Sequence, residues 1–237
     1  MVMHDRQRLR AAGKTIVGKV RPRNEDAILV REEIGLYVVA DGMGGHAAGD
    51  VASTMIVARL ESLPPSSGLD ALQIQVEAVL QQVNRDLRTL ARQLGVVVIG
   101  STVAVLLCDG VRTICGWAGD SRIYRLLEGN LQQLTRDHVI GEQQATGRRI
   151  GPVGALTRAV GACSRLEMEW LALEHGAGTR YLLCSDGLNN DIGDAGLEAI
   201  LRQCESPSDG VRRLFERISG GEGRDNISAI LVQGGLE

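Results

Sequence analysis

The sequence predicts an α+β fold in which helices cover antiparallel β-sheets. Two observations carry this prediction. Apolar runs of strand length at residues 101–108, 111–118 and 122–127 follow one another through short turns, and short connections favour antiparallel pairing. Helical patterns lie before these runs and again near the C-terminal end of the chain. Strands and helices that are grouped along the chain, rather than strictly alternating, are typical of an α+β domain.

The elements can be assigned in chain order. Residues 1–14 are expected to be a loose leader, followed by a short strand at 15–19. Strands at 27–30 and 35–40 can form a hairpin, because only a few residues separate them. A stripe of Leu and Val at spacings of three and four predicts the second helix. The other expected elements are helices at 47–61, 72–90, 194–204 and 208–218, and strands at 131–134, 166–173, 180–184 and 227–232.

Composition excludes several classes of protein. The chain has 237 residues, of which 44% are hydrophobic, so residues 1–237 can form one domain with a sizeable core. The net charge of −3 and the lack of a basic run argue against nucleic acid as a partner. No apolar run approaches the roughly 20 residues that cross a bilayer, and the polar N-terminus has no signal-peptide core. We therefore expect a cytoplasmic monomer with no membrane insertion.

The five cysteines indicate neither a disulfide framework nor cysteine chemistry. They form no C-x-x-C pair, and most lie in apolar runs, where a buried inert thiol is the usual role. None is followed by an Arg six positions later, so the phosphate-binding loop of a cysteine-dependent phosphatase is absent from the sequence.

The stretch from Tyr37 to His46 combines a buried strand, an aspartate and a glycine-rich turn. Residues 42–47 match the dinucleotide fingerprint G-x-G-x-x-A. That function needs a second strand ending in an acidic residue soon after the helix, whereas a Pro-rich joint at 63–68 and another helix follow here. The alternative is a metal site with Asp41 as a ligand, and the sequence favours it.

Acidic residues recur where predicted strands begin or end next to glycine. Any one of them is typical of a turn, but several meeting at one edge would repel by about 4 kcal/mol per pair at 4 Å. Divalent cations would offset that repulsion, and a set of oxygen ligands favours Mg²⁺ or Mn²⁺ over Zn²⁺. The residues are Glu25, Asp26, Asp41, Asp120, Asp186 and Asp225.

Eight segments in series resemble the motifs of the PPM (type 2C) family of metal-dependent Ser/Thr protein phosphatases, bacterial branch. They cover nearly the whole chain. The resemblance implies a four-layer αββα sandwich, with two central antiparallel β-sheets flanked by helix pairs. The segments are Arg21 with 24–26, 39–46, 100–102, 118–122, 134–138, 156–159, 183–188 and 223–227.

The resemblance also implies a role for each site residue. Asp41 would bridge two metal ions, and Asp186 and Asp225 would complete the shell of one of them. Glu25 and the carbonyl of Gly42 would serve the other ion. The remaining expected roles are orientation of bound water by Asp26, a third and weaker metal position at Asp120 with Asp186, and binding of the substrate phosphate by Arg21.

The implied activity is hydrolysis of phosphoserine and phosphothreonine in proteins. A water between two Mn²⁺ or Mg²⁺ ions would attack phosphorus in line, with Arg21, Asp41 and Asp186 as catalytic residues. The enzyme would oppose a bacterial Ser/Thr kinase, and its short length also resembles phosphatases of type VI secretion control. The alternatives are a pseudophosphatase that binds phosphoproteins without turnover and a nucleotide-binding oxidoreductase.

The sequence departs from the family pattern at three places. Met43 stands where some members carry a histidine that protonates the leaving group, and His46 is not expected to inherit that role. His138 is expected to be structural. The segment 139–155 is shorter than in most bacterial relatives, which predicts a trimmed flap and a more open site. Residues 189–191 replace the usual Thr and apolar residue without an evident reason.

Overall fold

The architecture was analysed in a computed structural model of the chain. The structure describes residues 9–44, 48–141, 154–176 and 178–234. His46 and most of the expected flap at 139–155 therefore lie outside the described residues, as do the first eight residues of the expected leader.

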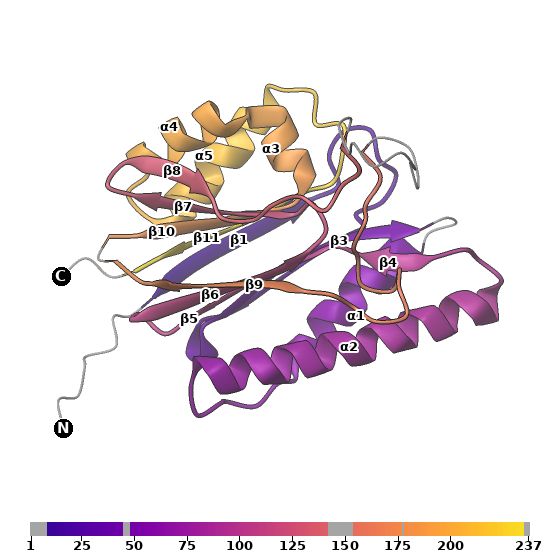
Figure 1. Cartoon of the computed structure of the whole chain (residues 1–237). Helices are drawn as coiled ribbons and strands as arrows, with labels where there is room; N and C mark the ends of the chain where they lie inside the picture. The colour runs from indigo at the N-terminus through magenta and orange to yellow at the C-terminus, as the bar shows by residue number, and fades with distance from the viewer. Residues whose placement is uncertain (1–8, 45–47, 142–153, 177, 235–237) are drawn as a thin grey trace.

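Two antiparallel sheets form the centre of the molecule (Figure 1). One has the order β1-β11-β10-β7-β8 and the other the order β2-β3-β5-β6-β9, with β4 paired to the end of β3. The first sheet comprises β1 (Arg10–Ile16), β11 (Ile227–Gln233), β10 (Arg180–Cys184), β7 (Arg122–Leu127) and β8 (Asn130–Gln133). The second comprises β2 (Asp26–Arg31), β3 (Leu36–Gly44), β5 (Val103–Cys108), β6 (Arg112–Ala118), β9 (Glu169–Glu174) and β4 (Ile99–Ser101).

Helices cover the outer face of each sheet, which gives four layers (Figure 1). Helices α1 (Gly49–Glu61) and α2 (Leu69–Leu94) pack on the second sheet, and α3 (Asp186–Ile192), α4 (Asp194–Gln203) and α5 (Pro207–Ser219) cover the first. The predicted αββα sandwich is confirmed. The short helix α3 is an addition to the expected pair, and it begins at an aspartate of the candidate site.

Three hydrophobic layers explain why the central strands are apolar on both faces. In β3, Leu36, Val38 and Ala40 pack beneath α1 and α2, whereas Tyr37 and Val39 lie between the two sheets. Strands β10 and β11 divide their side chains in the same way, between the α3–α5 layer and the layer between the sheets. Because alternate residues of a strand face opposite sides, a strand buried on both faces reads as a continuous apolar run.

The expected leader at 1–14 is wrong from Arg10 onward. Strand β1 begins there and pairs with β11 over its whole length. The backbone N–H of Ala11 also donates to Glu32 Oε1 at 2.6 Å. Ala11, Ala12 and Gly13 have low intrinsic preference for strands; the partner strand, which lies more than 200 residues later, stabilises them in this conformation.

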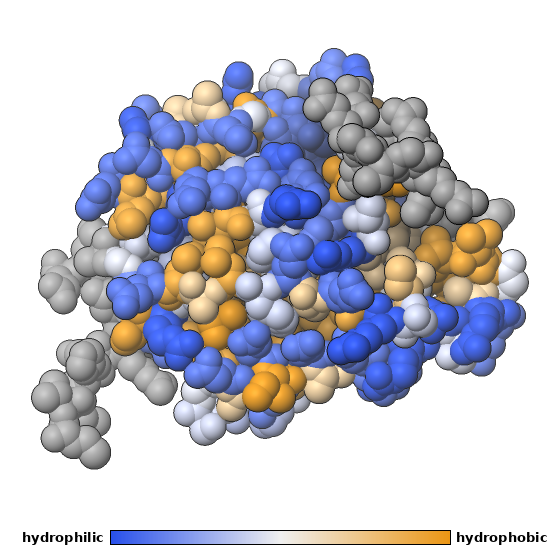
Figure 2. Space-filling view, viewed as in Figure 1, coloured by the Kyte–Doolittle hydropathy of each residue, from blue (hydrophilic) through white to orange (hydrophobic). Residues whose placement is uncertain are grey.

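Figure 2 shows polar and apolar residues interspersed over the open side of the sandwich, as on most folded domains, where apolar atoms contribute much of the surface. Among the helices of the described residues, none has both the length and the hydropathy to span a bilayer.

Candidate active site

Strand parity places Asp41 at the end of the layer between the sheets. Tyr37 and Val39 point into that layer, and Asp41 is the next residue of β3 on the same face. Strand β2 lies beside it in register, with Asp26 opposite Asp41. The side chain of Thr102 fixes the backbone there, because its Oγ1 accepts from the Asp41 N–H at 3.1 Å. The apolar strand therefore delivers a carboxylate to the rim of the sandwich.

A cavity of about 300 Å³ opens at this rim, and most of the predicted site residues line it. They come from the loop before β2, the end of β3, the β6–β7 turn, the start of α3 and the turn before β11. Segments far apart in the sequence thus meet at one place. The lining residues are Arg21, Glu25, Asp41, Gly42, Met43, Gly44, Thr102, Asp120, Leu156, Asp186, Asp225 and Asn226.

The carboxyl groups in this cavity raise one another's pKa values. Burial raises the pKa of Asp41 well above its usual value, and the charges of Asp26 and Asp186 raise it further. Burial, followed by the charge of Asp186, raises the pKa of Asp120 to about 6. The pKa of Asp186 is also raised, first by burial and then by Asp225. Groups that are costly to ionise together indicate a site built for a cationic partner.

Asp26 lies behind the cavity rather than in its wall. It is 7% exposed, and its Oδ2 accepts from the hydroxyls of Ser185 and Ser228, both at 2.7 Å. Its Oδ1 has no hydrogen-bond partner among the described residues. Burial raises the pKa of Asp26 to about 6, although the two serine hydrogen bonds oppose that effect. The position suits the predicted indirect role, with one oxygen anchored and the other available.

Arg21 contributes the positive charge at the cavity. Its Nη2 lies 2.8 Å from Asp225 Oδ2, and the Arg21 side chain is 53% exposed. Since an exposed ion pair is worth little in stability, the pair serves mainly to orient the side chain. The remaining guanidinium donors form a planar fork, which suits a phosphate group.

Close backbone contacts leave no space for a side chain at Gly42. A Cβ atom there would lie 2.0 Å from the Gly49 carbonyl oxygen and 2.6 Å from that of Glu25. The Gly42 N–H donates to the same Glu25 oxygen at 3.0 Å. Gly42 therefore lets the end of β3, the start of α1 and the Glu25 loop approach one another.

The donor set fits Mg²⁺ or Mn²⁺. Among the described residues that line it, the cavity offers carboxylate and backbone carbonyl oxygens and neither thiol nor imidazole ligands, and hard divalent cations prefer such oxygens. The unpartnered Oδ1 of buried Asp26 and the mutual repulsion of the acids also fit cationic ligands. Within the described residues, no three Asp, Glu, His or Cys side chains are arranged as a coordination sphere.

Sequence reasoning missed the supporting residues. Thr102 and Asn226 belong to matched motifs but had no assigned role. Of residues 189–191, Asp191 has a structural role, because its Oδ2 accepts from the Gly223 N–H at 2.8 Å and so holds the turn that carries Asp225. None of these roles is visible in local spacing, since each partner lies far away in the sequence.

The structural role predicted for His138 agrees with its surroundings. Its ring stacks on Trp117 with centroids 6.1 Å apart, and Nδ1 accepts from the Gly119 N–H at 3.2 Å. Its Nε2 lies 3.1 Å from Glu169 Oε1. His138 thus supports the turn that carries Asp120.

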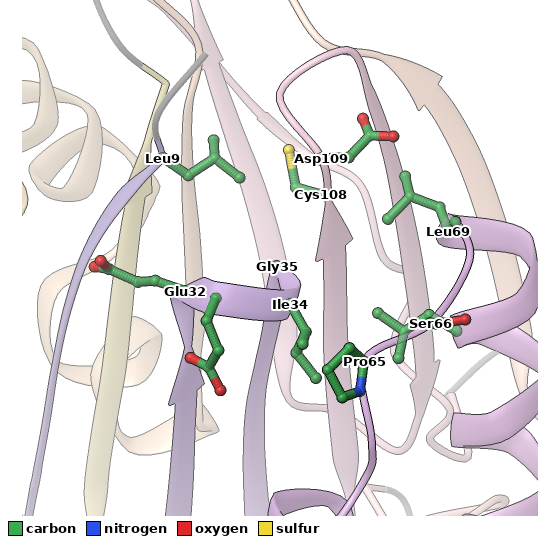
Figure 3. A pocket seen from close by; sticks show the side chains of 12 residues that line it. Leu9, Glu32, Ile34, Gly35, Pro65, Ser66, Leu69, Cys108 and Asp109 are labelled. Carbon is green, nitrogen blue, oxygen red and sulfur yellow. The ribbon is translucent and has the colours of Figure 1, made fainter. Parts of the chain in front are cut away.

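A larger cavity of about 600 Å³ lies at the opposite end of the second sheet (Figure 3). Its acidic residues already have partners: Glu32 accepts from the Ala11 N–H, Glu33 pairs with Arg31 at 2.7 Å, and Asp109 accepts two N–H groups of its own turn. It is lined elsewhere by apolar side chains such as Ile34. Size alone therefore does not identify the chemical site.

The fold and the site together define a metal-dependent phosphatase architecture. A family model described as Protein phosphatase 2C matches residues 19–224. The chain belongs to this family, whose members are metal-dependent phosphatases. The predicted family resemblance is confirmed.

Curated relatives carry matching names. A sequence from Mycobacterium tuberculosis (strain CDC 1551 / Oshkosh), named Serine/threonine protein phosphatase PstP, is 32% identical over 94% of this chain. The chain spans only 45% of that relative's length. A sequence from Listeria innocua, named Serine/threonine phosphatase stp, is 30% identical, with 96% of this chain and 97% of the relative covered.

Solved structures share the fold. A structure described as PppA, a key regulatory component of T6SS in Pseudomonas aeruginosa, matches with a TM-score of 0.90 and 41% identity, over 97% of this chain and 99% of that one. The catalytic domain of PstP, described as in complex with two manganese ions, matches with a TM-score of 0.83 and 30% identity over 97% of this chain and 99% of that one.

Proposed function

We propose that this chain is a protein phosphatase that hydrolyses phosphoserine and phosphothreonine with two Mn²⁺ or Mg²⁺ ions. The observation that carries the proposal is that Asp41, Asp186 and Asp225 line one cavity beside Arg21. The names of the relatives and the two manganese ions of the PstP structure support it.

We assign each residue at the cavity a role as a metal ligand or as a residue that assists the ligands. Asp41 would be a ligand of both ions, Asp186 and Asp225 would complete the ligands of one of them, and Glu25 with the Gly42 carbonyl would hold the other. Asp26 would orient bound water, and Asp120 with Asp186 would form a third, weaker ion position. When bound, the ions would neutralise the phosphate dianion and supply an activated water for in-line attack on phosphorus.

Arg21 is proposed to bind the substrate phosphate. Its side chain is half exposed and lines the cavity, and its guanidinium can donate to phosphate oxygens through the donors not used by Asp225. Met43 lines the cavity and has no transferable proton, so the proton of the leaving alkoxide must come from another group.

The names of the relatives support a wider biological role. We propose phosphorylated proteins as substrates and a cognate Ser/Thr kinase as the opposing enzyme. A role in type VI secretion control is supported by the 41% identity to PppA.

The chain is proposed to act as a cytoplasmic monomer with residues 1–237 in one domain. The shortened segment 139–155 is proposed to widen access to the site, which grafting a longer segment and measuring substrate preference would test.

Phosphate release decides whether this chain is an enzyme. The purified chain with Mn²⁺ should hydrolyse p-nitrophenyl phosphate and phosphothreonine peptides, and EDTA should stop the reaction. Asp186→Asn should abolish turnover, whereas Asp86→Asn, at a partly exposed position on α2, should not. A folded wild-type chain that binds phosphopeptides without releasing phosphate would instead support the pseudophosphatase.

A further inference from the structure

One buried amide outside the acidic set holds the loop that carries Arg21 and Glu25. Asn226 directly precedes β11 and is 5% exposed. Its Nδ2 donates to the carbonyl oxygens of Val17 and Arg23, and its Oδ1 accepts from the Glu25 N–H, all at 2.8 Å. One side chain therefore contacts both ends of the loop between β1 and β2.

The chemistry of an amide is required at this position. Two carbonyl oxygens need two donors and one N–H needs an acceptor, and only Asn or Gln offers both kinds of group on one planar head. In the reversed orientation, the Asn226 amide nitrogen would face the Glu25 N–H, and the amide oxygen would face the two carbonyl oxygens. The contacts therefore allow only one orientation of the amide. A carboxylate would face two carbonyl oxygens without donors, which leaves buried polar groups unsatisfied.

The same turn also contacts the loop through Asp225. Asp225 Oδ1 accepts from the Asn226 N–H at 2.9 Å, and Oδ2 lies 2.8 Å from Arg21 Nη2. The carbonyl of Glu25 in turn accepts from the Gly42 N–H. Hydrogen bonds thus connect the start of β11 to the loop between β1 and β2, and that loop to the end of β3. Asn226 makes three of the bonds to the loop.

We infer that Asn226 is a positioning residue that sets the loop at 17–25 so that Arg21 and Glu25 face the cavity. The inference rests on the proposed function for its kinetic consequences. Asn226 acts through these two residues: loss of the amide would release the loop from β11, and phosphate binding through Arg21 and ion binding through Glu25 would weaken together. A small displacement of a positioned group can lower kcat/KM about 10²-fold.

The experiment compares Asn226→Asp and Asn226→Ser with a matched control, Asn84→Asp. Asn84 is fully buried in α2 and bridges backbone groups of a different loop, donating to the Cys163 carbonyl at 3.0 Å and accepting from the Gly161 N–H at 2.7 Å. All variants are assayed for hydrogen exchange of residues 17–25, Mn²⁺ affinity by calorimetry, KM and kcat for p-nitrophenyl phosphate, and unfolding midpoint.

The Asn226 variants should speed exchange in the loop, raise KM and weaken Mn²⁺ binding by about tenfold each, a loss typical of one buried hydrogen bond. Asn84→Asp should lower the unfolding midpoint comparably and leave KM and Mn²⁺ affinity within about twofold. In an Arg21→Ala background, Asn226→Asp should raise KM less than it does alone.

Unchanged hydrogen exchange in the loop, or changed exchange with wild-type KM and Mn²⁺ affinity, would overturn the inference. A wild-type chain without turnover would defeat the proposed function, while exchange and Mn²⁺ affinity would still decide the role of Asn226.

Discussion

At the scale of single residues, the buried carboxyl groups of the candidate site lower the stability of the metal-free domain. Asp41 is buried among other carboxylates, and its pKa is raised first by burial and then by Asp26 and Asp186. Each unit of pKa shift corresponds to about 1.4 kcal/mol between the two protonation states. At neutral pH, keeping these carboxyl groups buried together therefore lowers the free energy of unfolding of the metal-free protein. Such a cost is expected where residues serve binding rather than packing.

Asp41→Asn should stabilise the metal-free protein while removing activity. The amide removes one charge from the repelling group and keeps the size of the side chain. In EDTA at pH 7.5, we expect the free energy of unfolding, measured by urea denaturation, to rise, because one of the repelling buried charges has been removed. With Mn²⁺, the same variant should show no phosphate release.

The control for this change is Asp86→Asn. Asp86 lies on α2, 3.4 Å from Arg59, and the two side chains are 31% and 59% exposed, respectively. Its neutralisation should change stability by less than about 1 kcal/mol and leave turnover intact. A metal-free Asp41→Asn protein less stable than wild type would show that the aspartate holds the local structure by other means.

Arg21→Lys should separate charge from shape at the phosphate subsite. Lysine keeps the positive charge but loses the planar fork of donors. We expect KM for a phosphothreonine peptide to rise about tenfold, the value of one lost charge-assisted hydrogen bond. Arg23→Lys, on the same loop, is the control. Equal KM values for wild type and Arg21→Lys would contradict a phosphate contact.

At the scale of elements, the end of β3 combines strand, turn and close packing. The apolar run through Ala40 predicts the strand, and its boundaries hold within a few residues. The close approach of α1 to Gly42 is not visible in the sequence, because it depends on how the helix crosses the sheet. The same applies to α3, whose seven residues are too few for a clear helical period.

Gly42→Ala should disrupt this junction. The added methyl would overlap the carbonyl oxygens of Gly49 and Glu25, so the backbone must shift. We expect a loss of about 1–3 kcal/mol in the free energy of unfolding together with weaker Mn²⁺ binding by calorimetry. Gly141→Ala, where no atom lies within 4 Å of the new Cβ, should change neither. Wild-type Mn²⁺ affinity in Gly42→Ala would remove Gly42 from the site.

At the scale of the whole molecule, the acids link folding to pH and to metal ions. The pKa values of Asp26 and Asp120 in the folded protein are each about 6, above the value near 4 of an unfolded aspartate. The metal-free folded state thus binds more protons between pH 4 and 6. The stability from this uptake is fully present below about pH 4 and is lost as the pH rises through about 6.

Mn²⁺ should therefore stabilise the protein more at pH 7.5 than at pH 5. At the lower pH, protons occupy part of the carboxylate set and compete with the ions. At 100 times the dissociation constant, ions that bind only the folded state add about 2.7 kcal/mol, equivalent to about 5–10 °C in Tm for a domain of this size. Calorimetric scans with Mn²⁺ and with EDTA at both pH values measure the difference. A larger Mn²⁺ effect at pH 5 would show that these acids are not the ligands.

The sequence alone determined the α+β class, most strands and helices, and the identity of the acidic residues. Hydrophobic periodicity and turn residues are local signals, and the eight motifs carry the family resemblance in their residue types. Asp41, Asp186 and Asp225 could be selected in this way because each follows an apolar strand or a glycine turn.

Only the tertiary structure decided how these pieces support one another. The strand at Arg10 forms because β11 pairs with it, and Asp26 is held behind the cavity by Ser185 and Ser228 from the other sheet. Asn226 reaches backbone atoms about 200 residues earlier in the chain. Such contacts join residues that are distant in sequence, and no local pattern records them because their geometry exists only after the two sheets have packed.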